Sequence, residues 1–181
     1  MKNIGVLVGS LRKGSYNKKV AEFMMSKFPD DFKPILIDIS KLQLYNEDLD
    51  QDDAPKEWTE FREIVAAMDA FLFVTPEYNR SVPAALKNAL DVASRPYGHN
   101  CWDNKPGGIV SVSVGNIGGF GANHHFRQSM VFLNIHLMAQ PEAYIGDITQ
   151  ALDENGQIAN ERTQSYLTDI TNHYADWVRR F

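Results

Sequence analysis

Serine, arginine and asparagine side chains gather in one short stretch near the start of the chain. Residues 4–8 are apolar, and a polar turn with two glycines separates them from a helical pattern. Such a turn presents free backbone N–H groups and the positive end of the helix dipole at one place. Hydroxyl and amide groups add neutral donors, and arginine adds a charged fork. We therefore predict a phosphate site, formed by Ser10, Arg12, Ser15 and Asn17.

The residue pattern of this turn restricts the class of phosphate ligand that the turn could bind. It has neither the Gly-x-Gly-x-x-Gly of a dinucleotide fingerprint nor the Gly-Lys-Ser/Thr of a Walker loop. Neutral donors with one arginine favour a mononucleotide monophosphate over a triphosphate with magnesium. The alternative is an ordinary strand-to-helix turn, which we consider weaker because four suitable side chains fall within one turn.

Two further turns carry unusual residues after apolar runs. Residues 76–81, Pro-Glu-Tyr-Asn-Arg-Ser, combine a rigid proline, an aromatic ring and an amide that can lie along a flat heterocycle. Gly115, Gly118 and Gly119 form a third turn in which the backbone can approach a ligand closely. Taken singly, each is equally well interpreted as a simple connection before a helix.

The elements around these turns predict how they are positioned. Apolar runs at residues 4–8, 35–39, 70–74, 108–114 and 142–145 alternate with helical patterns, which is typical of a parallel sheet covered on both faces. We predict one α/β domain over residues 1–181, a flavodoxin-like three-layer sandwich with strand order 2-1-3-4-5. Ligands bind beyond the carboxyl ends of such strands, where the strand order reverses. The turns after strands 1, 3 and 4 should therefore converge on one ligand.

Details of the helices are also predicted. Ser81 is expected to cap the third helix, with Pro83 in its first turn. The fourth helix is expected to place Phe126, Met130, Leu133 and Leu137 in the core. The acidic loop of residues 45–55 is interpreted as a solvated surface loop, with a flap beside the site as the alternative.

Composition excludes several classes of protein. The 181 residues carry a net charge of -5 without a basic cluster, which argues against nucleic acid as a partner. One cysteine, Cys101, excludes an intrachain disulfide, and the adjacent His124 and His125 make a poor metal pair. No signal peptide or membrane-spanning run is recognised, so we expect a cytoplasmic protein without a metal site or membrane contact.

Two motifs together make a specific resemblance. Gly9-Ser-Leu-Arg-x-x-Ser-x-Asn17 and Pro76-Glu-Tyr-Asn-x-Ser-x-Pro83, followed by Leu-Lys-Asn-Ala-x-Asp91, resemble the NAD(P)H-dependent FMN reductase family, which includes quinone, azo-dye and chromate reductases. The resemblance runs from the first strand through the glycine turn. Arg80 stands where many members have a glycine or another residue, and Val92 replaces an aromatic residue that often follows the Asp of the third helix. We expect Arg80 to face the nicotinamide co-substrate, the acceptor or a partner subunit.

The resemblance implies a set of FMN-binding residues. The phosphate would lie in the first turn, the isoalloxazine ring along the second, and further flavin contacts in the third. The implied cofactor-binding residues are Ser10, Arg12, Ser15, Tyr16, Asn17, Pro76, Glu77, Tyr78, Asn79, Ser81, Ser113, Gly115 and Gly119. Such an enzyme needs no catalytic side chain, because the cofactor carries the chemistry.

The expected activity is two-electron transfer from NADPH or NADH to a small acceptor such as a quinone, azo compound or flavin, by ping-pong hydride transfer. Family members form homodimers or homotetramers, so one of these states is expected. The alternative is a flavodoxin-like electron carrier with FMN and protein redox partners. Arg12 and residues 76–81 favour the reductase. A regulatory nucleotide-binding module without redox activity is a more distant alternative. The acceptor and the choice between the two nicotinamides are left open.

Overall fold

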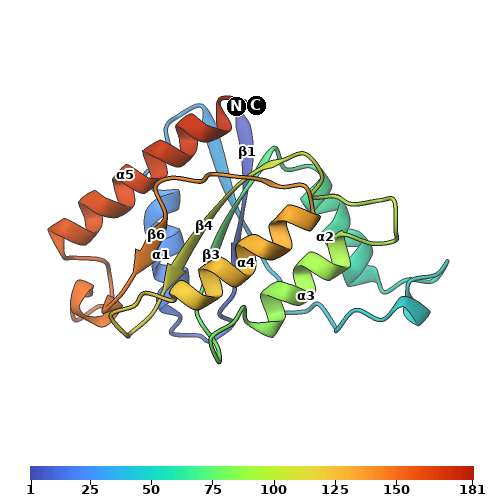
Figure 1. Ribbon diagram of the computed structural model, residues 1–181, viewed down its shortest axis with the longest axis horizontal. Coiled ribbons are helices and arrows are strands. Elements are labelled where there is room, and N and C mark those ends of the chain that lie inside the picture. Colours follow the sequence, from blue (N-terminus) through green and yellow to red (C-terminus); the bar gives the residue numbers. More distant parts are fainter.

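A sheet of parallel strands runs through the middle of the molecule, with helices on both faces (Figure 1). The structure is a computed structural model that describes all of residues 1–181. The helices and strands, in chain order, are β1 (Lys2–Val8), α1 (Tyr16–Met25), β2 (Phe32–Ile37), α2 (Lys56–Ala66), β3 (Ala70–Thr75), α3 (Ala84–Ala93), β4 (Pro106–Val112), α4 (Phe120–Phe132), β5 (His136–Leu137), β6 (Ala143–Ile145) and α5 (Glu161–Val178), with 3-10 turns η1 (Glu47–Leu49) and η2 (Ile148–Ala151).

The strand order is β2-β1-β3-β4-β5, which confirms the predicted flavodoxin-like arrangement. The sheet edge beside β4 differs from the prediction of one fifth strand, because two short strands, β5 and β6, lie along it. β5 pairs with the start of β4, at Pro106 and Gly107, whereas β6 pairs with its end, from Val110 to Val112. The prediction placed a fifth strand at β6 and missed β5, whose two residues are too few to give a periodic signal.

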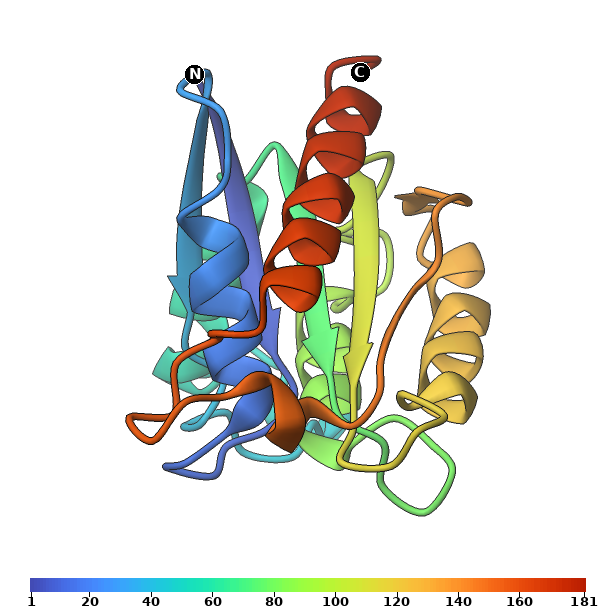
Figure 2. The same ribbon diagram turned by 90° about the vertical axis from the view of Figure 1, so that its left-hand side faces the viewer.

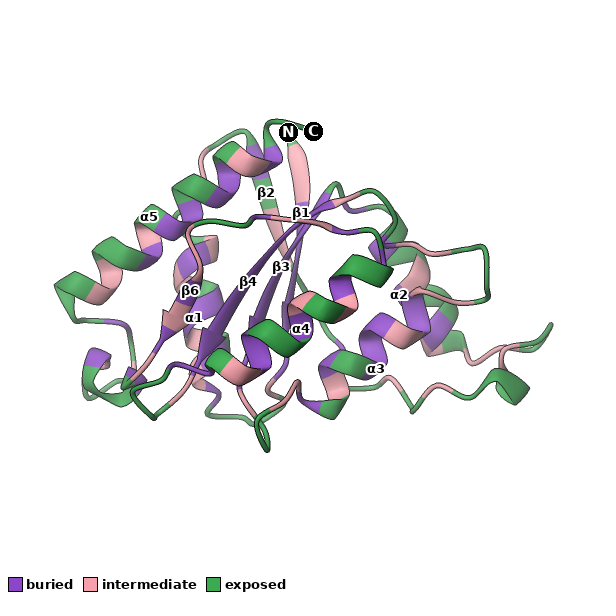
Figure 3. Ribbon diagram, in the orientation of Figure 1, coloured by how far each residue is buried: buried purple, intermediate pink, exposed green.

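Two hydrophobic clusters cover the two faces of the sheet. One packs α1 and α5 against the strands, and the other packs α2, α3 and α4 against the opposite face. Every residue of β3 and β4 is buried, as expected for central strands covered on both sides. Figure 3 shows these strands buried throughout, while each helix alternates buried and exposed surface.

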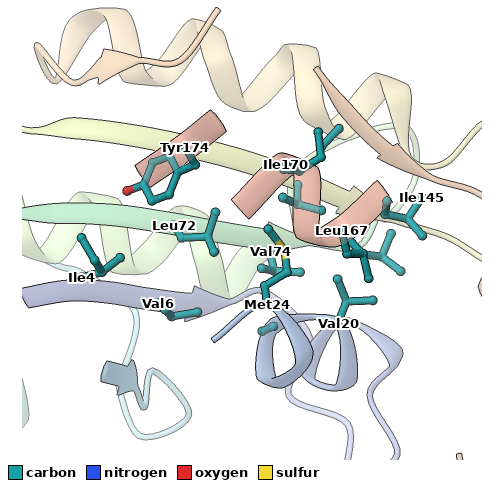
Figure 4. Packing of buried hydrophobic residues seen from close by; sticks show 14 of the residues in the cluster. Ile4, Val6, Val20, Met24, Leu72, Val74, Ile145, Leu167, Ile170 and Tyr174 are labelled. Atoms are coloured by element: carbon teal, nitrogen blue, oxygen red, sulfur yellow. The ribbon is translucent and has the colours of Figure 1, made fainter. Parts of the chain in front are cut away.

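The α1–α5 cluster includes buried residues of β1, β2, β3, β4 and β6. Val20 and Met24 of α1 meet Leu167 and Ile170 of α5 over the strands (Figure 4). Tyr174 is also fully buried there, and its hydroxyl donates to the Phe71 carbonyl at 2.7 Å. This bond satisfies a polar group that would otherwise be costly to bury.

The strands all run the same way, so their carboxyl ends form one edge of the sheet. In Figure 2 the arrowheads of β1, β3 and β4 point to this edge, and the turns that follow them gather below it. The predicted convergence of three turns at the switch point is therefore present in the fold.

Two predicted details are wrong. Ser81 does not cap α3, because Pro83 occupies the N-cap position and the helix begins at Ala84. Proline has no side-chain acceptor, and the Ser81 hydroxyl is engaged elsewhere. Leu137 is not on α4, which ends at Phe132, but in β5. A helical spacing that continues by chance into a strand produced this error.

The acidic loop of residues 45–55 is anchored to the body of the protein. Asp50, only 4% exposed in its side chain, accepts two hydrogen bonds from Arg62 of α2 at 2.8 and 2.7 Å. The Tyr45 N–H donates to the Asn88 side chain at 2.8 Å. The loop is therefore more than a solvated connection, because a shielded ion pair holds its middle.

No helix has the length and apolar character required to cross a membrane.

Candidate active site

The first turn, residues 9–15 between β1 and α1, has an unusual supply of unpaired donors. Of the backbone N–H groups from Ser10 to Ser15, only that of Ser15 has an acceptor in the chain, the Arg12 carbonyl at 3.0 Å. Ser15 is the N-cap of α1, and its side chain accepts from the Lys18 N–H at 3.2 Å. The remaining amides and the start of α1 form a cradle suited to an anion.

The side chains of this turn also fit a phosphate. Asn17 is 5% exposed, and its Oδ1 is the one buried side-chain polar atom in the chain without a hydrogen-bond partner. A buried amide left unsatisfied is costly unless a ligand engages it. The Arg12 guanidinium lies 4.9 Å from the centroid of the Tyr16 ring, which supports it from one side. Gly14 lies under the same guanidinium, since a Cβ there would be 3.1 Å from Nη1.

The second turn, after β3, is a tight hairpin. The backbones of Tyr78 and Ser81 exchange two hydrogen bonds, of 3.1 and 2.9 Å. Asn79 and Arg80 form its tip with φ angles of 51° and 63°, the left-handed conformation that a two-residue hairpin requires. Asparagine tolerates this conformation, whereas arginine is strained there. The hairpin holds Tyr78, which is half exposed, in a defined position at the edge of the sheet.

Gly9 joins the first turn to the second. A Cβ at this position would lie 2.9 Å from Pro83 and 3.1 Å from Pro76. Only glycine lets the two turns approach this closely. The two motifs are therefore packed directly against each other, although they are far apart in the sequence.

Glu77 joins the second turn to the third. Its Oε2 accepts the N–H of Ala122 in the first turn of α4 at 2.9 Å, so a negative charge lies at the positive end of that helix. Its Oε1 lies 3.7 Å from the guanidinium of Arg80, and its side chain is 15% exposed. Glu77 was expected to line the flavin ring, but its carboxylate is occupied by α4.

The third turn, after β4, is shaped by glycines. Gly118 and Gly119 have φ angles of 66° and 75°, and Gly119 is the N-cap of α4. The Ser113 hydroxyl accepts the N–H of Gly115 at 3.1 Å and orients the start of the turn. A Cβ on Gly119 would contact Ser111 at 3.1 Å, so the turn lies close against the end of β4.

The structure therefore places all the predicted site residues at one edge of the sheet. Those of the first turn lie on the segment between β1 and the start of α1, those of the second follow β3, and those of the third follow β4. In this order they are Ser10, Arg12, Ser15, Tyr16 and Asn17, then Pro76, Glu77, Tyr78, Asn79 and Ser81, then Ser113, Gly115 and Gly119.

Two histidines at the start of α4 belong to the surroundings of this site. His125 Nδ1 and the Ser81 hydroxyl are 2.8 Å apart, which links the second turn to α4 a second time. His124 Nε2 lies 2.8 Å from the Tyr144 hydroxyl. Both side chains are exposed. The periodicity of α4 shows that adjacent histidines diverge, but only the tertiary structure identifies their partners.

Tyr144 donates from its hydroxyl to Glu142 Oε2 at 2.6 Å. Burial, followed by this hydrogen bond and the Glu142 charge, raises the pKa of Tyr144 well above its usual range. The phenol therefore remains protonated at neutral pH and acts as a structural donor. The Phe120 ring lies 4.2 Å from the imidazole of His124, which completes a packed cluster beside the third turn.

Known proteins resemble this chain in both sequence and structure. The sequence profile described as NADPH-dependent FMN reductase matches residues 2–150. A quinone reductase of Pseudomonas putida is 49% identical over 177 residues, covering 98% of this chain and 95% of the relative. A 2-hydroxy-1,4-benzoquinone reductase of a Burkholderia species is 47% identical over 176 residues, covering 97% and 96%.

A solved structure agrees with these sequence matches. FerB, a flavoenzyme NAD(P)H:(acceptor) oxidoreductase of Paracoccus denitrificans, superposes with a TM-score of 0.92 at 35% identity, covering 99% of this chain and 98% of that one. The sheet order, the three convergent turns and these matches lead to one assignment. The chain belongs to the NADPH-dependent FMN reductase family of oxidoreductases.

Proposed function

We propose that this chain is a single-domain FMN enzyme that transfers two electrons from NADPH or NADH to a quinone. The observation that carries the proposal is the first turn and the start of α1, where unpaired backbone amides, the Arg12 fork and the unsatisfied Asn17 amide occur within eight residues. The second and third turns are packed beside it through Gly9 and Glu77. A phosphate at one end and a flat ring along the other two turns match this arrangement.

The proposed roles follow the three turns. Ser10, Arg12, Ser15 and Asn17 hold the phosphate, with Tyr16 supporting Arg12. Pro76, Tyr78, Asn79 and Ser81, with the backbone of Glu77, line the ring, and Ser113, Gly115 and Gly119 complete its border. Backbone N–H groups near Glu77 and Gly115 act as fixed dipoles toward negative charge on the ring. When bound, FMN supplies the two-electron redox chemistry, so no side chain is assigned as a catalytic acid or base.

The kinetic order and the acceptor are also proposals. One open face that serves the donor and the acceptor in turn predicts ping-pong kinetics. The names of the relatives from Pseudomonas putida and the Burkholderia species support a quinone as acceptor, with azo compounds and free flavins as further candidates. The reducing nicotinamide pool that such an enzyme needs favours the cytoplasm as its location.

A homodimer or homotetramer is proposed as the working form. Val131 and Phe132, at the end of α4, are 80% and 78% exposed, and their burial would favour association. Light scattering after size-exclusion chromatography tests this point, and a monomer at micromolar concentration would contradict it.

Anaerobic reduction of the purified, FMN-loaded protein tests the central proposal. Adding NADH or NADPH should bleach the flavin absorbance, and adding a benzoquinone should restore it. A yellow protein that neither nicotinamide bleaches would favour an electron carrier with protein partners. A protein that takes up no FMN would refute the proposal and favour a nucleotide-binding module without redox activity.

A further inference from the structure

A cavity of about 400 Å³ opens between the first turn and the carboxyl end of β2. We call it the β2 cavity; its lining includes Leu11, Arg12, Lys13, Lys18, Leu36 and Asp38. Its volume is in the range of small-molecule sites. Because the strand order is β2-β1-β3-β4, it lies on the opposite side of β1 from the second and third turns. Ser10 and Arg12, which are assigned to the FMN phosphate, also line it, so the β2 cavity adjoins the phosphate site. A flavin ring beside the second and third turns would leave the part at Lys13, Lys18 and the end of β2 open to another molecule.

The charge around the β2 cavity favours an anionic ligand. Besides Arg12, which is assigned to the FMN phosphate, Lys13 and Lys18 line it together with a single carboxylate, Asp38, in a chain whose net charge is -5. Lys13 has no carboxylate within ion-pair distance, and Lys18 has only a loose contact of 3.9 Å with Glu22 on the surface of α1. The hydrogen bond from the Ser40 N–H lowers the pKa of Asp38, and the charges of Lys41 and Lys18 lower it further. Positive charge thus outweighs negative charge in the lining of this cavity.

The remaining walls match the other parts of a nucleotide. Leu11 and Leu36 are exposed aliphatic side chains that a flat base can cover. Asp38 Oδ1 accepts the N–H of Ser40 at 2.8 Å, and the carboxylate lies in the cavity wall, where it can accept a further donor. Ribose hydroxyls are such donors, and a carboxylate at the end of the second strand accepts them in other nucleotide-binding folds. Cations, an apolar wall and a carboxylate thus correspond to the phosphate, base and sugar of a nucleotide.

We propose that the β2 cavity binds the adenosine diphosphate end of the nicotinamide co-substrate, with Lys13 and Lys18 on phosphate and Asp38 on a ribose hydroxyl. This inference rests on the proposed function and extends it to a second nucleotide subsite. β2 and β4 are separated by three strand intervals, about 14 Å in total at about 4.8 Å each. An extended dinucleotide can cross this distance, with its nicotinamide over the third turn and its adenosine end at β2.

The test uses FMN-saturated protein and the double variant Lys13→Ala/Lys18→Ala. Isothermal titration with ADP as the probe should show at least tenfold weaker binding than in the wild type. The KM for NADH should rise by a similar factor while kcat and the Kd for FMN are unchanged. Lys33→Ala is the matched control, since it removes the same charge at the opposite end of β2 and should alter none of these values.

Three results would overturn the proposal. They are the absence of ADP binding to FMN-loaded wild-type protein, an equal effect of Lys33→Ala, and a loss of FMN affinity as large as the loss of ADP affinity. The last result would assign the β2 cavity to the FMN phosphate. FMN binding by the wild-type protein is measured separately. A protein that binds no FMN would refute the proposed function itself.

A second variant tests the sugar contact. Asp38→Asn removes a negative charge that opposes a phosphate on the ribose 2′ position. The affinity for 2′,5′-ADP relative to ADP should therefore rise at least threefold in this variant. An unchanged ratio would show that Asp38 does not face the ribose and would overturn that assignment.

Discussion

Replacing Glu77 tests whether the second and third turns form one unit. Glu77→Ala removes the charged acceptor of the Ala122 N–H, a bond of 2.9 Å at the start of α4. A hydrogen bond to a charged group contributes about 1.5–3 kcal/mol, and the side chain is 15% exposed, so little is lost to solvent screening. Part of this value is the interaction with the helix dipole, about 0.3–1 kcal/mol.

We expect Glu77→Ala to lower the free energy of unfolding by about 2–3 kcal/mol. For a chain of this length this corresponds to a decrease in Tm of about 4–12 °C. Urea denaturation of the FMN-free protein measures the loss directly. Because the third turn also loses its support, the Kd for FMN should rise in a fluorescence titration.

Glu77→Gln is the matched control. Its amide oxygen can still accept the Ala122 N–H, so only the charge is lost, and the decrease in stability should be about 0.5–1 kcal/mol. The reasoning is refuted if Glu77→Ala and Glu77→Gln have the same effect. It is also refuted if Glu77→Ala changes the free energy of unfolding by less than about 0.5 kcal/mol, the usual range of a surface substitution.

Three other substitutions have defined outcomes. Arg12→Ala should weaken FMN binding by about 1.5–3 kcal/mol, because a charge-assisted contact to phosphate is lost; an unchanged Kd in a flavin titration would exclude this role. Arg80→Gly should stabilise the protein by about 0.5–1 kcal/mol in urea denaturation, because relief of the left-handed strain exceeds the added freedom of the unfolded chain. Asp50→Ala should lower the free energy of unfolding by about 3–5 kcal/mol in urea denaturation, because it leaves the Arg62 charge shielded and unpaired. The double variant Asp50→Ala/Arg62→Met should recover part of this loss. A double variant that recovers none of it would contradict the ion-pair explanation.

Much of the fold could be predicted from local patterns. The central strands appear as unbroken apolar runs because both faces are covered, and β3 is buried at every residue. The alternation of strands and helices then restricts the connections to right-handed crossovers. The split edge strand could not be predicted in the same way. β5 has two residues, so its identity depends on pairing with Pro106 and Gly107 rather than on its own sequence.

The candidate site was predictable in its position and less so in its contacts. Polar turns after the first, third and fourth strands had to meet at one edge once the strand order was known. The direction of individual side chains depends on neighbours that are distant in the sequence. Glu77 turns to α4 rather than toward a ring, and Ser81 pairs with His125 rather than capping α3.

The sequence by itself determined that this chain forms a doubly wound α/β sheet with a polar, donor-rich turn after its first strand. These features are local, because they depend on apolar periodicity, glycine and donor-rich side chains within a few residues. Only the tertiary structure decided that Gly9 brings two turns into contact, that Glu77 connects the second turn to the third, and that cations and Asp38 share a cavity beside β2. Such contacts join residues from separate strands, and it is the packing of the sheet against its helices that brings them together.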